Sequence, residues 1–211
     1  MFQLGIWTGK LAGISSQAIG MNGTSIPGMV GAKIDFNLLK RLGKQVENII
    51  IVTGTNGKTT TSNLISSIFE ETREPFINNA EGSNLISGVT SSFVNEADLF
   101  GRIKGIRYAI LEVDEITLVK VLKKITPKAI VITNFFRDQL DRFGEIDTLI
   151  KKMEDAIRPV NTKLILNADD PFSVRLAALN KETIYFGLNQ QAHQFQTQTV
   201  SESKFCPRCG K

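Results

Sequence analysis

Short runs of apolar residues recur along the chain, and each has the length of a buried β-strand. One of them, Asn48–Val52, is apolar at every position after the first. A run that is apolar on both faces is typical of a strand in a parallel sheet that is covered on both sides. We predict strands at Asn48–Val52, Pro75–Ile77, Arg107–Val113, Lys128–Thr133, Lys163–Leu166 and Thr183–Phe186.

Longer segments with helical periodicity separate these runs. They lie at Lys58–Glu70, Asn84–Asn95, Glu115–Lys124, Glu145–Ile157 and Pro171–Leu179. Strands that alternate with helices of this length are joined by right-handed crossovers. The pattern therefore predicts an α/β fold, with a parallel sheet and helices on both of its faces.

The first 45 residues mix glycine-rich loop sequence with helical sequence. We expect loops over Gly20–Gly31 and a helical stretch near Asp35–Gly43. The apolar start of the chain fits a short amphipathic helix docked on the core, or a surface that touches a membrane through Phe2, Ile6 and Trp7. The docked helix is favoured, because helices that lie in a membrane interface usually carry more basic residues on their polar face.

Composition narrows the class of protein. Hydrophobic residues make up 42% of the chain and charged residues 22%, which excludes a disordered chain, a fibre and a bundle of membrane spans. The formal net charge of +4 does not by itself point to nucleic acid, although it suits a phosphate-bearing ligand. The two cysteines both lie near the end of the chain rather than across the fold, which indicates a reducing compartment.

The strongest motif is a glycine-rich loop between the first predicted strand and the helix that follows it. Backbone N–H groups of such a loop turn around phosphate oxygens, and the helix N-terminus adds partial positive charge. Lys58 can reach the β and γ phosphates, and the Thr59 hydroxyl can ligate Mg²⁺. The first glycine of the general phosphate-loop pattern would fall at Val52 and is found at Gly54 instead. We predict nucleotide binding by Gly54, Thr55, Asn56, Gly57, Lys58, Thr59 and Thr60.

Polar residues at the ends of later strands are further candidates for the site. Glu112 ends its strand where a doubly wound sheet faces its ligand, so it can complete the coordination of Mg²⁺. Asp114 or Glu115 can cap the helix that follows. Asn134 also ends a strand, whereas Asp138, Asp141 and Arg142 fit a surface turn held by salt bridges. Asn167, Asp169 and Asp170 fit helix capping and nucleotide contact equally well.

The remaining candidates lie near the end of the chain. His193 has no catalytic partner near it in the sequence, and no nucleophile set is visible, so hydrolytic amidase chemistry is not expected in this chain. Cys206 and Cys209 form a Cys-x-x-Cys turn. Because structural zinc needs four ligands, this pair is only half of a zinc site. As the sequence stands, an unoccupied tail or a local disulfide is favoured over a well-formed zinc site.

Several of these motifs together resemble the Mur ligases and the folylpolyglutamate synthases. The resemblance rests on the T-G-T-N-G-K-T-T loop, on the turn that contains Asn84, on Glu112, on Thr133–Gly144 and on the N-A-D-D-P turn that begins at Asn167. It implies ATP-dependent activation of a carboxylate as an acyl phosphate. It also implies that Asn84, Asn134 and Asn167 lie near the nucleotide, that Glu112 binds Mg²⁺, and that Lys58 and Glu112 are catalytic.

The sequence departs from the family pattern at two places. Gln139 stands where the family has a histidine that ligates a second magnesium. The modified lysine of the family has no obvious equivalent, although Lys151 and Lys152 lie in the right neighbourhood. We therefore expect one metal, or a contact with the second metal through water.

Within the family, the resemblance is strongest to the synthetase subunits that amidate the D-glutamate of lipid II in peptidoglycan synthesis. It implies ATP, Mg²⁺ and zinc as cofactors, with zinc only if a second cysteine pair is supplied, and a glutaminase partner of the GatD type. It also implies a cytoplasmic protein that works at the inner face of the membrane. We expect a helical and loop segment at 1–45, an ATP-binding domain at 46–190, and a linker with the start of a truncated zinc ribbon at 191–211. The alternatives are an ATP-binding fragment without turnover and a folylpolyglutamate synthase-like ligase.

Overall fold

The centre of the fold is a sheet of six parallel strands. The computed structural model describes the chain except for residues 21–22, 80–82, 136–142 and 189–211. The strands are β1 (Asn48–Thr53), β2 (Phe76–Asn78), β3 (Tyr108–Glu112), β4 (Ala129–Ile132), β5 (Lys163–Asn167) and β6 (Thr183–Phe186). Their order in the sheet is β2-β3-β1-β4-β5-β6, and every neighbouring pair is parallel. The six predicted strands are confirmed.

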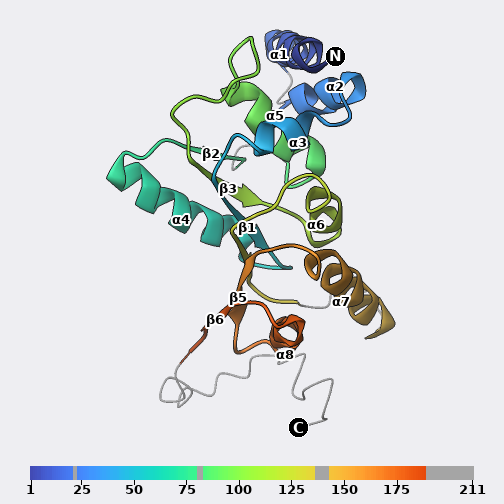
Figure 1. Cartoon of the computed structure of the whole chain (residues 1–211), viewed down its shortest axis with the longest axis vertical. Coiled ribbons are helices and arrows are strands. Elements are labelled where there is room, and N and C mark those ends of the chain that lie inside the picture. The colour runs from blue at the N-terminus through green and yellow to red at the C-terminus, as the bar shows by residue number, and fades with distance from the viewer. Residues whose placement is uncertain (21–22, 80–82, 136–142, 189–211) are drawn as a thin grey trace.

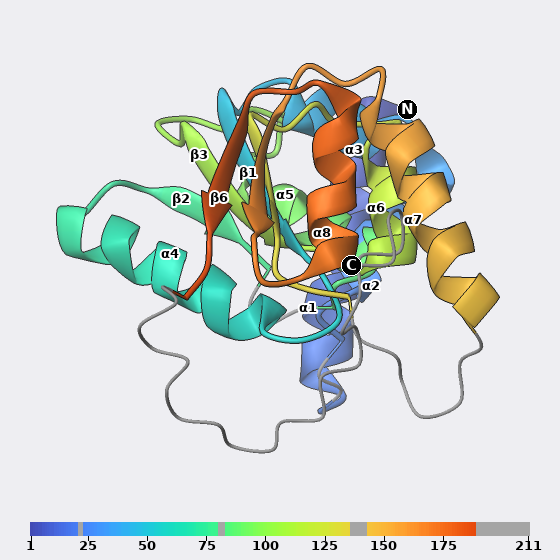
Figure 2. The same ribbon diagram turned by 90° about the horizontal axis from the view of Figure 1, so that it is seen from below.

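Helices cover both faces of the sheet, as predicted. They are α4 (Lys58–Thr72), α5 (Ile86–Glu96), α6 (Glu115–Val121), α7 (Phe143–Ile157) and α8 (Pro171–Arg175), which continues into the 3-10 helix η1 (Leu176–Leu179). The crossover from β1 to β2 runs the opposite way across the sheet from the later crossovers. Because crossovers are right-handed, α4 lies on one face, and α6, α7 and α8 lie on the other (Figure 2). The ring of Phe69 anchors α4 to the sheet through Phe76 and Tyr108, with ring centroids 5.7 and 4.9 Å away.

Three helices precede the sheet and pack at one end of the molecule (Figure 1). They are α1 (Phe2–Ala18), α2 (Ile26–Ile34) and α3 (Leu38–Gly43). The prediction of loops over Gly20–Gly31 is wrong from Ile26 onward, because α2 begins there. The favoured prediction of a helix docked on the core is confirmed for α1, whose residue Ile6 is fully buried. Of the three residues named for the alternative of a membrane-touching surface, only Trp7 is exposed.

Glycines explain the error over α2, because they allow close helix packing there rather than turns. A Cβ on Gly28 would lie 2.1 Å from the carbonyl oxygen of Ser87 and 2.5 Å from the nitrogen of Ser91, both on α5. A Cβ on Gly9 of α1 would lie 2.6 Å from the carbonyl oxygen of Pro27 on α2. The backbones of α1, α2 and α5 therefore approach one another at positions where only glycine fits.

The core lies between the sheet and its helices. Among the largest fully buried side chains are Ile51, Ile110, Leu111 and Ile130 on the central strands and Phe93 on α5. In the described part of the chain, no helix has the length and apolar character that crossing a membrane requires.

Candidate functional site

The predicted phosphate loop lies where the sheet reverses its winding. The chain leaves β1 toward β2 on one side and leaves β4 toward β5 on the other. In open α/β sheets, ligands bind outside the carboxyl ends of the strands at such a point. Residues 54–57 follow β1, and Thr133 and Asn134 follow β4. The fold thus brings the two segments together.

Both glycines of the loop have backbone conformations that favour glycine. Gly54 has φ +128°, and Gly57 has φ +79° at the start of α4. Gly54 also has a steric reason, because its Cβ would lie 2.3 Å from Thr133 Oγ1 and 2.8 Å from the carbonyl oxygen of Asn134. The displaced first glycine of the motif therefore lets the loop lie directly against the segment after β4.

Thr133 and Asn134 hold the loop in place. The backbone N–H of Thr55 donates to the carbonyl of Asn134 at 2.9 Å, and the N–H of Asn56 donates to Asn134 Oδ1 at 3.0 Å. Asn134 Nδ2 donates back to the carbonyl of Asn56 at 3.1 Å, and Thr133 Oγ1 donates to the same carbonyl at 2.7 Å. The sequence predicted Asn134 as a site residue, whereas the role of Thr133 was missed. Its position directly after a strand was the available signal.

The start of α4 is free to accept an anion. Lys58 Nζ lies over the loop and donates to the carbonyls of Gly54 and Thr55, at 2.6 and 3.1 Å. No side chain caps the helix at Gly57, whereas Asp114 caps α6 and Asp170 caps α8. The N–H groups of the first turn of α4 are thus left for a ligand, and the helix dipole favours a negative one. The exposed Thr59 is in this first turn.

Glu112 ends β3 directly beside β1. It is paired in register with Val52, two residues before the loop begins. The buried side chain of Asn79 fixes its backbone, accepting from the N–H of Glu112 and donating to its carbonyl, both at 2.8 Å. The half-buried carboxylate of Glu112 is available to a ligand at this edge of the sheet. Sequence reasoning did not assign this role to Asn79, because the contact joins segments 33 residues apart.

Asn84 and the acidic residues after β3 lie next to Glu112. The N–H of Asp114 donates to the carbonyl of Asn84 at 3.1 Å. Asp114 Oδ1 accepts from the N–H groups of Ile116 and Thr117, so the predicted cap of the helix is Asp114. Glu115 is buried in the first turn of the helix instead.

The residues after β5 mainly brace the site from the side. Asn167 Nδ2 donates to the carbonyl of Thr133 at 2.8 Å, and its Oδ1 accepts from the N–H of Asp169. Asp170 caps α8 and accepts from the N–H of Phe135 at 2.8 Å. Burial raises the pKa of the Asp170 carboxyl, and the N–H groups that it accepts act against this. Capping is confirmed for Asp170, while nucleotide contact by Asn167 stays a prediction.

Several predicted site residues lie outside the described part of the chain: Asp138, Gln139, Asp141, Arg142, His193, Cys206 and Cys209. Lys151 and Lys152 are exposed on α7. Among the described residues, no three His, Cys, Asp or Glu side chains group together as a metal cluster would require. A magnesium ion here would therefore need phosphate oxygens and water in addition to Thr59 and Glu112, which is the usual way in which Mg²⁺ is held beside a nucleotide.

A cavity of about 780 Å³ lies beside these elements, between α1, α4, α5 and the end of β2. Small hydroxyl and amide side chains line much of it, including Asn63, Ser66, Asn79, Ser91 and Asn95. Neutral groups of this kind can donate and accept hydrogen bonds but cannot offset a large charge. Lys10, Glu70 and Glu96 also line the cavity, and their one positive and two negative charges do not suit a triphosphate.

Comparison with known proteins agrees with this geometry. The chain is 43% identical over 202 residues to the MurT subunit of lipid II isoglutaminyl synthase (glutamine-hydrolyzing) from Staphylococcus aureus (strain COL). It is 37% identical over 206 residues to the subunit of the same name from Streptococcus pneumoniae. These matches cover 96% and 95% of this chain, and 45% of each relative. The chain therefore spans less than half the length of these curated relatives.

Solved structures show the same fold. The MurF ligase of Thermotoga maritima, determined in complex with ADP, matches with a TM-score of 0.59 at 20% identity, over 74% of this chain and 36% of that one. MurF from Acinetobacter baumannii matches with a TM-score of 0.57 at 19% identity, over 79% of this chain and 34% of that one. Residues 52–209 match the family model described as the Mur ligase middle domain. This chain therefore belongs to the Mur ligase family.

Proposed function

We propose that this chain is the nucleotide-binding part of an ATP-dependent amide ligase that acts on lipid II. The ligase transfers the γ-phosphoryl group of ATP to the α-carboxylate of the D-glutamyl residue, forming an acyl phosphate and ADP. Ammonia then attacks the acyl carbon, phosphate leaves, and the nitrogen loses a proton, so that the D-glutamyl residue becomes its α-amide, D-isoglutamine. The name of the relatives supports this chemistry, and their greater length makes it a proposal for the whole enzyme rather than for this chain alone.

One observation carries the proposal: the loop between β1 and α4, with its uncapped helix N-terminus. Residues Gly54–Gly57 cradle the phosphates, and Lys58 offsets the negative charge on the γ-phosphoryl group during its transfer. Lys58 now donates to two loop carbonyls, and these bonds are exchanged for bonds to phosphate oxygens when the nucleotide binds. Asn134 keeps the loop in this form.

Magnesium fits the same place. Thr59 supplies a hydroxyl and Glu112 a carboxylate, both oxygen ligands of the kind that Mg²⁺ takes. Once bound, the ion would neutralise part of the charge on the phosphates. Asn79 positions Glu112 through two bonds to its backbone, so it acts as a positioning residue.

Other parts of the proposal follow from the resemblance and from the name of the relatives. A GatD-like glutaminase supplies the ammonia, and the enzyme works in the cytoplasm at the inner face of the membrane, where lipid II carries its peptide. Residues 46–190 form the ATP-binding domain, after a segment at 1–45. Cys206 and Cys209 would supply two of the four ligands of a structural zinc, which binds only if a second cysteine pair is supplied.

An amidation assay tests the proposal. ATP, lipid II, glutamine and the glutaminase partner are supplied to this sequence within a full-length ligase, and the amide is detected by mass spectrometry. We expect Lys58→Ala and Glu112→Gln to lower kcat by about 10²-fold or more, since each removes charge stabilisation of the transferred phosphoryl group. As a matched control, Lys128→Ala and Glu182→Gln change exposed residues that directly precede β4 and β6, at the end of the sheet opposite the loop, and should leave kcat unaltered.

A second candidate function is ATP binding without turnover. A polypeptide of this length could bind ATP without turning it over, because it matches only 45% of the curated relatives. Assaying the 211-residue chain beside the full-length ligase separates the two functions. Amidation by the 211-residue chain would exclude the binding-only function, whereas ATP binding without amidation would support it.

A further inference from the structure

The outward face of α1 is apolar, which is unusual for a helix on the surface of a protein. Leu4, Trp7, Leu11 and Ile14 recur at spacings of three and four residues, so they form one stripe along the helix. Between 45% and 64% of each side chain is exposed. The opposite side of the helix carries the buried residues, among them Ile6 and Gly9. The stripe therefore points away from the core.

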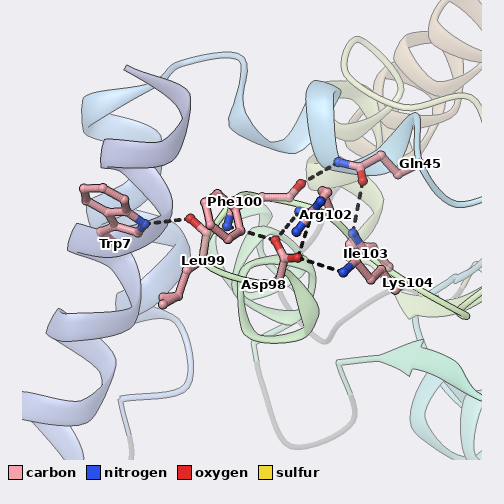
Figure 3. A network of polar contacts seen from close by, with 9 residues as sticks. Trp7, Gln45, Asp98, Leu99, Phe100, Arg102, Ile103 and Lys104 are labelled. Carbon is pink, nitrogen blue, oxygen red and sulfur yellow. Dashed lines mark hydrogen bonds and ion pairs between the residues drawn. The ribbon is translucent and has the colours of Figure 1, made fainter.

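A second segment extends this apolar surface. Leu99 and Phe100 are both 62% exposed in the loop between α5 and β3. The indole N–H of Trp7 donates to the carbonyl of Leu99 at 2.7 Å, which places the loop beside α1 (Figure 3). We call the six residues Leu4, Trp7, Leu11, Ile14, Leu99 and Phe100 the N-terminal apolar face.

The loop is held in shape before any partner arrives. Asp98 Oδ1 accepts from the N–H groups of Phe100 and Arg102, both at 2.9 Å, and Gln45 bonds to Gly101 and Ile103 (Figure 3). Hydrogen bonds to the carboxylate hold the pKa of Asp98 at about 2, chiefly that from the backbone N–H of Arg102. Because the loop is already ordered, its exposed apolar tip loses little conformational entropy on docking.

Positive charge gathers in the same part of the molecule. Residues 1–45 contain five basic residues and one acidic residue, a net charge of +4. That equals the formal net charge of the whole chain, so residues 46–211 sum to zero. Arg102 and Lys104 flank the loop tip, where both pair with Asp98, and the guanidinium of Arg102 lies 4.9 Å from the ring centroid of Phe100.

We propose that the N-terminal apolar face docks on an anionic membrane surface. The apolar side chains enter the boundary between headgroups and acyl chains, while the nearby basic residues face lipid phosphates. A helix of a protein partner or of a second copy fits less well. The positions that flank the stripe (Thr8 and Ser15 on one side, Gln3, Lys10 and Gln17 on the other) carry one basic residue and no acidic one, so they lack the opposite charges that such pairs use. The inference deepens the proposed function, since lipid II is held in a membrane.

Trp7 makes the proposal directly testable because it is the only tryptophan in the sequence. The 211-residue chain is titrated with vesicles of phosphatidylglycerol and phosphatidylcholine, or of phosphatidylcholine alone, while Trp7 fluorescence and co-sedimentation are followed. We expect a blue shift of the emission and binding with the anionic vesicles. With neutral vesicles, or in 1 M salt, binding should fall by about tenfold or more, since roughly five basic residues lose their attraction.

Two double substitutions test whether vesicle binding depends on the N-terminal apolar face or is non-specific binding by any exposed apolar residue. Leu11→Gln with Ile14→Gln, and independently Leu99→Gln with Phe100→Gln, should each lower the vesicle partition coefficient at least tenfold. Leu64→Gln with Ile68→Gln is the matched control, because these residues are exposed to the same extent on α4. The control should keep the wild-type partition coefficient. Circular dichroism confirms that each variant is folded, and the second pair serves if the first does not fold.

Two outcomes would overturn the proposal. One is the absence of binding and of a blue shift with anionic vesicles while the wild-type chain is folded. The other is a concentration-dependent dimer that Leu11→Gln with Ile14→Gln abolishes, which would make the face an interface between copies. ATP binding is measured on the same samples. A chain that binds vesicles but not ATP contradicts the proposed function alone, and the reverse result contradicts the docking proposal alone.

Discussion

The two glycines of the phosphate loop are required for different physical reasons. Gly57 lies in the left-handed region with open space where a Cβ would be, so only its backbone conformation favours glycine. Gly54 combines φ +128° with a close approach to Thr133 and Asn134. A side chain at either position would strain the backbone. At Gly54 it would also clash with Thr133 and Asn134.

Gly54→Ala should destabilise the protein more than Gly57→Ala. We expect a loss of about 2–4 kcal/mol in the free energy of unfolding for Gly54→Ala, because the Cβ meets backbone atoms that cannot move independently. Gly57→Ala should cost about 1 kcal/mol, from backbone strain alone. Urea denaturation of both variants measures the difference. Equal losses would mean that the loop relaxes away from Thr133 and Asn134.

Asp98 gives a pH dependence whose direction follows from its pKa. The pKa is about 2 in the folded protein and 3.8 for the ordinary group, so the folded state favours the charged form. This contribution to stability is fully present above about pH 4 and is lost as the pH falls toward 2. Asp98→Asn should therefore lower the melting temperature at pH 7, with a difference from wild type that shrinks as the pH falls from about 4 through 2. A difference that persists unchanged down to pH 2 would contradict the charge-based explanation.

At the scale of elements, the chain after β4 and helix α8 are joined through one carboxylate. Asp170 accepts from the N–H groups of Phe172 and Ser173 at the start of α8, and from the N–H of Phe135 after β4. The residue that caps α8, Asp170, therefore also positions the segment after β4 that holds the phosphate loop. This joint is independent of the nucleotide, because it consists entirely of protein groups.

Asp170→Ala should cost about 2–4 kcal/mol in the free energy of unfolding, since it removes a helix cap and leaves a buried N–H without an acceptor. Asp169→Ala is the control. Asp169 is exposed and accepts only from the N–H of Leu188 among the hydrogen bonds of the described residues. Its loss should stay below about 1 kcal/mol. Comparable losses for the two variants, measured by urea denaturation, would show that capping is not what Asp170 contributes.

The elements differ in how well the sequence predicts them, for physical reasons. The inner strands were predictable because burial makes each of them a continuous apolar run. The edge strand β6 was predictable from its apolar and aromatic residues, although most of them are exposed. Helix α2 was missed because Gly28 and Gly31 are typical of turns in a sequence, whereas here they let helices approach closely. Asn134 and Glu112 were predictable as strand-end residues. Asn79 and Thr133 were not assigned, because their contacts join segments that only the folded sheet brings together.

At the scale of the whole molecule, ligand binding should appear as global stability. The described core connects the phosphate loop to the sheet through β1, β4 and β5, so a ligand that holds the loop holds all three strands. A ligand that binds only the folded state shifts the unfolding equilibrium according to its concentration relative to its Kd. Thermal unfolding therefore reports nucleotide binding without any turnover.

Mg²⁺ and ATP at about 100 times the Kd should stabilise the chain by about 2.7 kcal/mol. For a chain of this size that corresponds to a rise of about 5–10 °C in Tm. Lys58→Ala should abolish most of the rise, because it removes the cation above the loop, and Glu112→Gln should reduce the rise only when Mg²⁺ is present. Lys128→Ala, an exposed change directly before β4 at the opposite end of the sheet, should leave the rise intact. A wild-type chain that unfolds cooperatively but gains no Tm from Mg²⁺ and ATP would mean that the loop, although formed, does not bind nucleotide in this part of the ligase.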